Sequence, residues 1–172
     1  MDNSTKSTGW AVLDVDPDKK GNERYTLVDY DTIKRNNKNL QEMLAVYEET
    51  VYKLIDDYKP DCISAEQMFV STNRKTAMSL AFIHAVMLLC AYKRNVPVTY
   101  YAVMTLKSKI LGGIKVKKED GTRKTGKEMK QEVQNKVIEI LGKENFTKKY
   151  NDDVTDAMSA AIVYDIMDGE TI

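Results

Sequence analysis

The spacing of hydrophobic residues changes along the chain, and the order of these changes limits the folds that it can form. Residues 9–15 (GWAVLDV) and 23–31 (ERYTLVDYD) have the composition of strands, and the turn-rich DPDKKGN between them predicts a β-hairpin. After residue 39 the apolar residues recur at helical spacing as far as Pro60, which ends the helix. Short apolar segments and longer helical segments then alternate to the end of the chain.

This alternation predicts the remaining elements. The helix at 76–94 is apolar around much of its circumference, so it is expected to be buried or to form a subunit contact. Asn151 or Asp152 is a suitable N-cap for the last helix. A hairpin followed by alternating helices and strands predicts a single α/β domain over residues 1–172, with a mixed sheet. The predicted strands are 61–66 and 96–101, and the predicted helices are 40–59, 76–94, 103–111, 127–141 and 152–167.

Composition narrows the class of protein further. Basic and acidic side chains number 26 each, so a polyanionic partner would have to be bound by a local basic surface. Cys62 and Cys90 have no metal-binding or redox spacing, and we interpret them as buried thiols in a reducing cytoplasm. No run approaches 18 apolar residues and no apolar signal segment opens the chain, so neither a membrane span nor export is expected.

Residues 112–127 (GGIKVKKEDGTRKTGK) differ in character from the rest of the chain. Their glycines predict a loop or a small hairpin, and their cations are candidates for contacts with a phosphate backbone. A solvated charged loop is the alternative. A second basic cluster lies at 143–149, just before the last helix. The candidate DNA-binding cations of the first segment are Lys115, Lys117, Lys118, Arg123, Lys124 and Lys127.

Acidic residues occupy positions where an α/β fold is expected to form a site. Glu66 ends the apolar strand DCISAE, at the sheet edge where such folds bind ligands. Asp153 and Asp156 share one face of the last helix, and Asp156 falls on its apolar side, where a carboxylate normally has a cation as partner. A solvated strand end and favourable charges at a helix N-terminus are the alternative explanations. With Asp2, these carboxylates suit Mg²⁺ or Mn²⁺, because no His or Cys accompanies them.

Three short segments carry a resemblance to a known family. They are DNSTKSTGWAV, ISAEQMF and DDVTDAMSAAI. Their order, separation and element types resemble the three signature segments of the Holliday-junction resolvases of the RuvC type, within the ribonuclease H-like superfamily. The resemblance covers essentially the whole chain. The STKSTG sequence and the moderate length of the chain most resemble those of bacteriophage members of the family. It implies a ribonuclease H-like α/β fold, with a mixed five-stranded sheet flanked by helices.

The resemblance implies roles for individual residues. Asp2, Glu66, Asp153 and Asp156 match the four metal-binding carboxylates of the family, and the D-x-x-D spacing favours Asp153 over its rival Asp152.

Further matches concern the contacts with DNA. Phe69 matches an aromatic residue that stacks on unpaired bases near the crossover, with a core position as its alternative. Lys107 and Lys130 match basic residues close to the scissile phosphate. The match of Lys130 crosses an insertion, because the loop at 112–127 is longer than in the cellular family pattern. Lys6 lies in the turn after the first acid, near where a phosphate must lie.

The start of the chain agrees with the family in one respect and departs from it in another. Thr8 and Gly9 match a T-G pair that closes the turn, where glycine tolerates a backbone that other residues avoid. Family members have about half a dozen apolar residues before the first acid, whereas only Met1 precedes Asp2 here. A truncated first strand is therefore expected.

The implied function is a metal-dependent endodeoxyribonuclease that resolves four-way (Holliday) and related branched DNA junctions. Two divalent ions held by the acids would activate a water and relieve charge on the leaving oxygen. Because His84 is the only histidine, a Ser-His-Asp triad is not available. A junction has near two-fold symmetry, so a homodimer formed through the helix at 76–94 is expected to bind it in the cytoplasm.

Three other functions remain open from the sequence. One is an actin-like ATPase or sugar kinase, although the chain is short for the two domains that these proteins need. The second is a catalytically impaired nucleic-acid-binding module of the same fold, since an incomplete first strand would support the site poorly. The third is a related nuclease acting on other substrates such as RNA–DNA hybrids.

Overall fold

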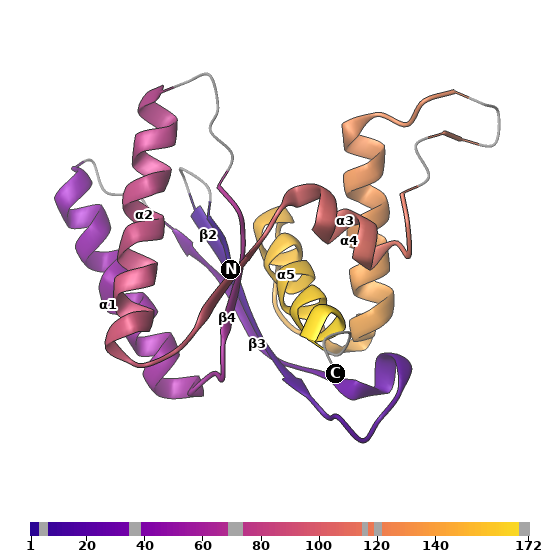
Figure 1. Cartoon of the computed structure of the whole chain (residues 1–172), viewed down its shortest axis with the longest axis horizontal. Helices are drawn as coiled ribbons and strands as arrows, with labels where there is room; N and C mark the ends of the chain where they lie inside the picture. The colour runs from indigo at the N-terminus through magenta and orange to yellow at the C-terminus, as the bar shows by residue number, and fades with distance from the viewer. Residues whose placement is uncertain (4–6, 35–38, 69–73, 115–116, 119–121, 169–172) are drawn as a thin grey trace.

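The computed structural model describes residues 1–3, 7–34, 39–68, 74–114, 117–118 and 122–168, and for Asp2, Asn3, Lys75 and Asp168 it describes the backbone alone. Strands lie between two layers of helices, with α1 and α2 on one face and α3, α4 and α5 on the other (Figure 1). The predicted α/β class is confirmed. The strands are β1 (Asp2–Asn3), β2 (Ser7–Val15), β3 (Tyr25–Lys34), β4 (Ile63–Glu66) and β5 (Val98–Tyr101), and the helices are α1 (Leu40–Tyr58), α2 (Arg74–Lys93), α3 (Val103–Ile110), α4 (Gly126–Leu141) and α5 (Asp152–Asp168).

The strands pair as the sequence predicts, but not in one continuous ladder. β1, β2 and β3 are antiparallel neighbours, and β4 pairs in parallel with β5. Two hydrogen bonds join these groups: the Met1 amino group donates to the Ser64 carbonyl at 2.5 Å, and the Glu66 N–H donates to the Met1 carbonyl at 3.3 Å. The expected five-stranded sheet is therefore divided in the part of the chain that is described, because β1 is only two residues long.

Local sequence signals explain where the helices begin and end. Asn39 caps α1 by accepting the Glu42 N–H at 3.0 Å, and the helix ends with Lys59 in the left-handed conformation (φ 46°), just before Pro60. Thr125 and Glu128 form a reciprocal capping box at the start of α4. Asn151 caps α5 by accepting the Val154 N–H at 3.2 Å, as expected.

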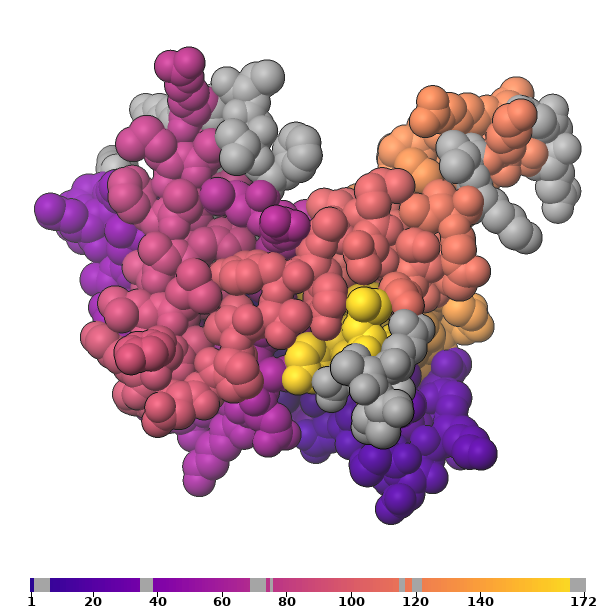
Figure 2. Space-filling view, viewed as in Figure 1, coloured from indigo at the N-terminus to yellow at the C-terminus, as the bar shows by residue number. Residues whose placement is uncertain are grey.

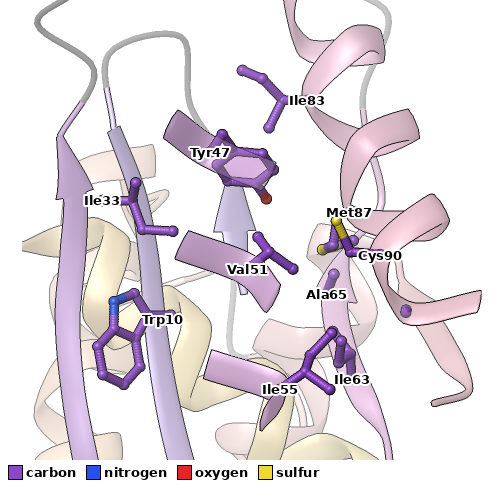
Figure 3. Packing of buried hydrophobic residues seen from close by; sticks show 11 residues of the cluster. Trp10, Ile33, Tyr47, Val51, Ile55, Ile63, Ala65, Ile83, Met87 and Cys90 are labelled. Carbon is purple, nitrogen blue, oxygen red and sulfur yellow. The ribbon is translucent and has the colours of Figure 1, made fainter. Parts of the chain in front are cut away.

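Two hydrophobic cores lie on opposite faces of the strands. The first packs α1 and α2 against β2, β3 and β4, and Figure 3 shows its side chains pointing toward one another. The second packs α3, α4 and α5 against the other face and contains Tyr30, Val137, Met158 and Ile162. Because strands are covered on both faces, the chain buries apolar side chains in two layers, which is the usual arrangement of an α/β domain.

Helix α2 differs from expectation in its hydropathy. Residues Thr76–Lys93 are long and apolar enough to cross a membrane by length and composition, with a mean hydropathy of 1.5. Only 22% of this window is buried, whereas a core helix that passes the same test is mostly buried. Here Ile83, Met87 and Cys90 are fully buried against the first core, and α2 packs beside α1 (Figure 1).

Gly9 does not close a turn, which corrects the sequence interpretation. It lies inside β2, which begins at Ser7, and it pairs with Asp2 on one side and Thr32 on the other. A Cβ atom at this position would overlap the backbone carbonyl of Asp153. The requirement for glycine is therefore steric: it lets the first turn of α5 lie directly on the strand.

This contact generates a stability prediction. We expect Gly9→Ala to destabilise the fold by about 1–3 kcal/mol, because overpacking forces α5 away from β2. Chemical denaturation measures the change. Gly126→Ala is the matched control, because no atom lies within 4 Å of its added Cβ, and we expect it to be neutral or to stabilise by up to about 1 kcal/mol. Equal effects of the two substitutions would contradict the close contact.

Candidate active site

Two of the predicted acids meet at one cavity. Glu66 ends β4 and Asp156 lies one turn into α5, and both line a cavity of about 180 Å³. Lys107 from α3 and Lys130 from α4 line the same cavity. Residues from four elements that are far apart in the sequence thus converge, and this convergence is the expected geometry of a site at the carboxyl end of a strand. The other lining residues are Val103, Leu106, Val133 and Ser159.

Burial and mutual repulsion set the charge of the two carboxylates. Burial raises the pKa of Glu66, the negative charge of Asp156 raises it further, and Lys107 and Lys130 oppose the rise. The pKa of Asp156 is also raised, chiefly by burial, although the hydrogen bond and charge of Lys130 lower it. The protein by itself therefore stabilises the two ionised carboxylates less well than water does. A cation bound between them would be favoured.

Lys130 is held between two acids of α5. Its Nζ lies 2.9 Å from Asp156 Oδ2 and 3.4 Å from Asp152 Oδ2. Burial lowers the pKa of Lys130, but the hydrogen bond and charge of Asp156 outweigh this and the pKa is raised overall. Gln134, one turn further along α4, donates to Asp152 Oδ1 at 2.8 Å. Asp152 therefore contacts Lys130 instead of facing the cavity, where Asp156 lies.

Asp153 faces the strands instead of this cavity. The Ser7 hydroxyl donates a hydrogen bond to Asp153 Oδ2, and Ser7 opens β2. The sequence signals did not single out Ser7. Ser7 lies in the segment that contains Asp2, and this position was the available signal for a contact with an acid. Only the approach of α5 to β2 shows that the acid is Asp153.

The structure brings together part of the predicted four-acid set. The backbone of Asp2 lies in β1, next to both β2 and β4. The structure does not describe its side chain. Among the side chains that are described, no group of three His, Cys, Asp or Glu residues is close enough to hold a metal ion. Glu66 and Asp156 form the described pair, and Asp153 interacts electrostatically with Asp156.

The basic segment at 112–127 forms a small hairpin in its described part. Lys117 and Arg123 are bridge partners, and the Lys118 N–H donates to the Thr122 carbonyl at 2.8 Å. Two of its lysines are already paired. Lys118 Nζ lies 2.6 Å from Glu128 Oε1, and Lys124 Nζ lies 2.6 Å from Glu132 Oε1.

The remaining described cations of this segment are exposed. Lys117, Arg123 and Lys127 form no ion pair with any residue that the structure describes. Figure 2 shows the surface hollowed between the N-terminal end of α2 and this segment. Lys6, Phe69 and Lys115, which the sequence also singled out, lie outside the described residues.

Comparison with known proteins agrees with this arrangement. The solved structure of T. thermophilus RuvC in complex with Holliday junction substrate superposes with a TM-score of 0.77 at 18% identity, covering 98% of this chain and 92% of that one. A second Thermus thermophilus RuvC structure gives a TM-score of 0.78 at 18% identity, over 99% and 93% of the two chains. The crossover junction endodeoxyribonuclease RuvC of Fusobacterium nucleatum is 28% identical over 166 residues, which are 95% of this chain and 77% of that protein.

The fold is that of the solved RuvC structures, and one cavity in it brings carboxylates and lysines together. The family described as crossover junction endodeoxyribonuclease RuvC matches residues 1–164. The chain belongs to this family.

The raised pKa of Glu66 generates a second prediction. Without divalent metal at pH 7, we expect Glu66→Gln to raise the thermal midpoint, because the folded state no longer holds a buried charge beside Asp156. For an acid whose folded pKa is raised, this gain is present above the folded pKa. It disappears as the pH falls to the unfolded value of about 4.3, where the native carboxyl is protonated in both states.

Asp156→Asn is the matched comparison for this measurement. It removes a carboxylate from the same cavity, but it also removes the 2.9 Å partner of Lys130. We therefore expect a smaller rise, or a fall, in the midpoint. Thermal scans of both variants between pH 4 and pH 8 in chelator measure the difference, and a loss of stability for Glu66→Gln at pH 7 would show that its carboxylate is well compensated.

Proposed function

We propose that this chain resolves four-way and related branched DNA junctions by hydrolysing phosphodiester bonds at the Glu66–Asp156 cavity. The observation that carries the proposal is the convergence of two buried carboxylates and two lysines on one cavity at the end of β4, in a member of the RuvC family. A phosphodiester needs both kinds of group, since carboxylates bind metal ions and ammonium groups bind phosphate oxygens. The proposed site of action is the cytoplasm.

The proposed ligands of two Mg²⁺ ions, with Mn²⁺ as an alternative, are the carboxylates of Asp2, Glu66, Asp153 and Asp156. The donor set fits, because it offers oxygen alone and because the raised pKa values of Glu66 and Asp156 report a shortage of positive charge. When bound, two such ions make a water nucleophilic at neutral pH and relieve charge on the leaving oxygen.

The chain's own residues have separate tasks in this proposal. Lys107 and Lys130 line the cavity with their ammonium groups, where they stabilise the negative charge that develops on the phosphate. Asp156 and Asp152 keep Lys130 protonated by raising its pKa. The apolar side chains of Val103, Leu106 and Val133 exclude part of the water from the cavity, which strengthens these electrostatic interactions.

Cleavage of a synthetic four-way junction tests the proposal. We expect Glu66→Gln to reduce cleavage by about 100-fold or more in Mg²⁺, because a metal ligand is lost, while junction binding is retained. Glu49→Gln is the matched control on the exposed surface of α1, and it should cleave at the parental rate. Parental cleavage by Glu66→Gln would refute the site. Equal cutting of linear duplex, three-way and four-way DNA would refute junction selectivity.

DNA binding is proposed for the hollow beside the basic segment. Lys117, Arg123 and Lys127 carry exposed charge that no described residue neutralises, so they are available to phosphates. Lys118 and Lys124 contribute less, because Glu128 and Glu132 already pair with them. Phe69, Lys6 and Lys115 retain their proposed roles in stacking and phosphate contact.

A salt series distinguishes these two groups of cations. We expect Lys117→Ala with Arg123→Ala to weaken junction binding and to reduce the slope of log K against log salt by about 2, roughly one for each lost phosphate contact. The control is Lys124→Ala with Glu132→Ala, which removes an ion pair without changing net charge. Similar slopes for the two double variants would contradict the assignment.

A homodimer is proposed through the outer face of α2. Met78, Phe82, Leu89 and Tyr92 recur at helical spacing and are 41–81% exposed, which makes one apolar stripe along the helix. Large apolar stripes of this kind mark interaction surfaces. A symmetric contact along α2 would present two copies of the cavity to the two strands of a junction.

A further inference from the structure

A polar network joins α4 and α5 beside the active-site cavity. Lys130 and Gln134 are four residues apart on α4, and Asp152 and Asp156 are four residues apart on α5, so each pair lies on one face of its helix. Lys130 contacts both acids, and Gln134 contacts Asp152. One turn further along α4 thus meets one turn further back along α5, which means that the two helices run antiparallel at this contact.

The two acids of the network differ in their surroundings. Asp156 lines the cavity with Glu66, and its side chain is 22% exposed. Asp152 does not line that cavity, and its side chain is 66% exposed. An exposed carboxylate remains ionised without a bound cation, because it is burial that disfavours the charged form. Asp152 can therefore accept an ammonium group at the rim of the cavity while Asp156 is engaged inside it.

Gln134 determines how Asp152 meets the lysine. Its Nε2 donates to Asp152 Oδ1 at 2.8 Å, and the other oxygen, Oδ2, lies 3.4 Å from Lys130 Nζ. The contact of Lys130 Nζ with Asp156 Oδ2 is shorter, at 2.9 Å. Lys130 thus has one close partner and a second, oriented partner that a movement of about 0.5 Å would bring equally close.

The close contact conflicts with metal binding at the same carboxylate. Lys130 and a divalent cation both require the negative charge of Asp156, and the two cations repel each other at short range. A metal ion that binds Asp156 must therefore displace the lysine or bind against its charge. The outcome depends on whether the displaced ammonium group keeps an ionic partner.

We propose that Asp152 is a positioning residue that receives Lys130 when a divalent cation binds Asp156. The ammonium group exchanges the Asp156 carboxylate for Asp152 Oδ2 and remains at the rim of the cavity, within reach of a phosphate oxygen. Metal binding costs less free energy with this exchange, because the lysine keeps an ionic partner. The inference rests on the proposed role of Asp156 as a metal ligand.

Binding of Mn²⁺ to the protein without DNA tests the exchange, with the free ion measured by electron paramagnetic resonance. We expect Asp152→Asn to weaken Mn²⁺ binding by about 3–5-fold, the size of effect expected from the loss of an exposed ion pair. In a Lys130→Met background the same substitution should change the affinity by less than about twofold, because no lysine then needs a second partner.

Glu139→Gln is the matched control for this cycle. It removes an acid of α4 that is 62% exposed and pairs with Lys136, away from the network. We expect it to leave Mn²⁺ binding at the parental level. Thermal midpoints, measured first, establish that each variant is folded.

A crystal structure of the parental chain with Mn²⁺ bound tests the exchange without any substitution. We expect Lys130 Nζ within about 3.2 Å of an Asp152 oxygen and more than about 4 Å from both oxygens of Asp156.

Three results would overturn the inference and leave the proposed metal site standing. The first is an equal loss of Mn²⁺ affinity for Asp152→Asn in both backgrounds, which would indicate a general effect of charge. The second is a lower thermal midpoint with unchanged Mn²⁺ binding, which would confine Asp152 to a role at the helix N-terminus. The third is a metal-bound structure in which Lys130 still contacts Asp156. Parental Mn²⁺ binding by Asp156→Asn would overturn both the inference and the proposed metal site.

Discussion

The direct packing of α5 on the strands is the constraint on which the rest of the structure depends. Gly9 lets the first turn of the helix rest on β2, and the Ser64 hydroxyl of β4 donates to the Ala160 carbonyl at 2.6 Å. The small side chains of Ala157 and Ala160 on α5 are also buried. A Cβ atom at Gly9 would separate the helix from β2, because packed interiors have little free volume.

The same packing determines the electrostatics of the site. It places Asp156 beside Glu66 in a partly buried cavity, where burial and like charge raise the pKa of both carboxylates. Lys130 offsets part of this cost from α4. Asp152 of α5 contacts the lysine, and Gln134 of α4 donates a hydrogen bond to Asp152. Carboxylates whose negative charge is only partly balanced by nearby lysines attract divalent cations, as a metal-dependent nuclease site requires.

Much of the fold could be predicted from local signals, and the errors have local causes. The hairpin, the alternation of helices and strands, Pro60 after α1 and Asn151 before α5 all follow from turn chemistry, periodicity and capping. The glycine at position 9 was misread, because a sequence shows that a Cβ is absent but not which backbone comes close. The short first strand was predicted but the resulting division of the sheet was not, since the number of pairing partners of a strand is a tertiary property.

The candidate site shows the same division between sequence and structure. By itself, the sequence determined the candidate residues: Glu66 at a strand end, Asp153 and Asp156 on one helix, and lysines at 107 and 130 in segments that resemble a nuclease family. Only the tertiary structure decided that Glu66, Asp156 and the two lysines share a cavity, that Asp153 contacts Ser7, and that Asp152 contacts Lys130. The physical reason is distance along the chain. Spacing within one helix or strand follows from its geometry, whereas contacts between residues 22 to 146 positions apart depend on how α5 packs against the sheet and α4.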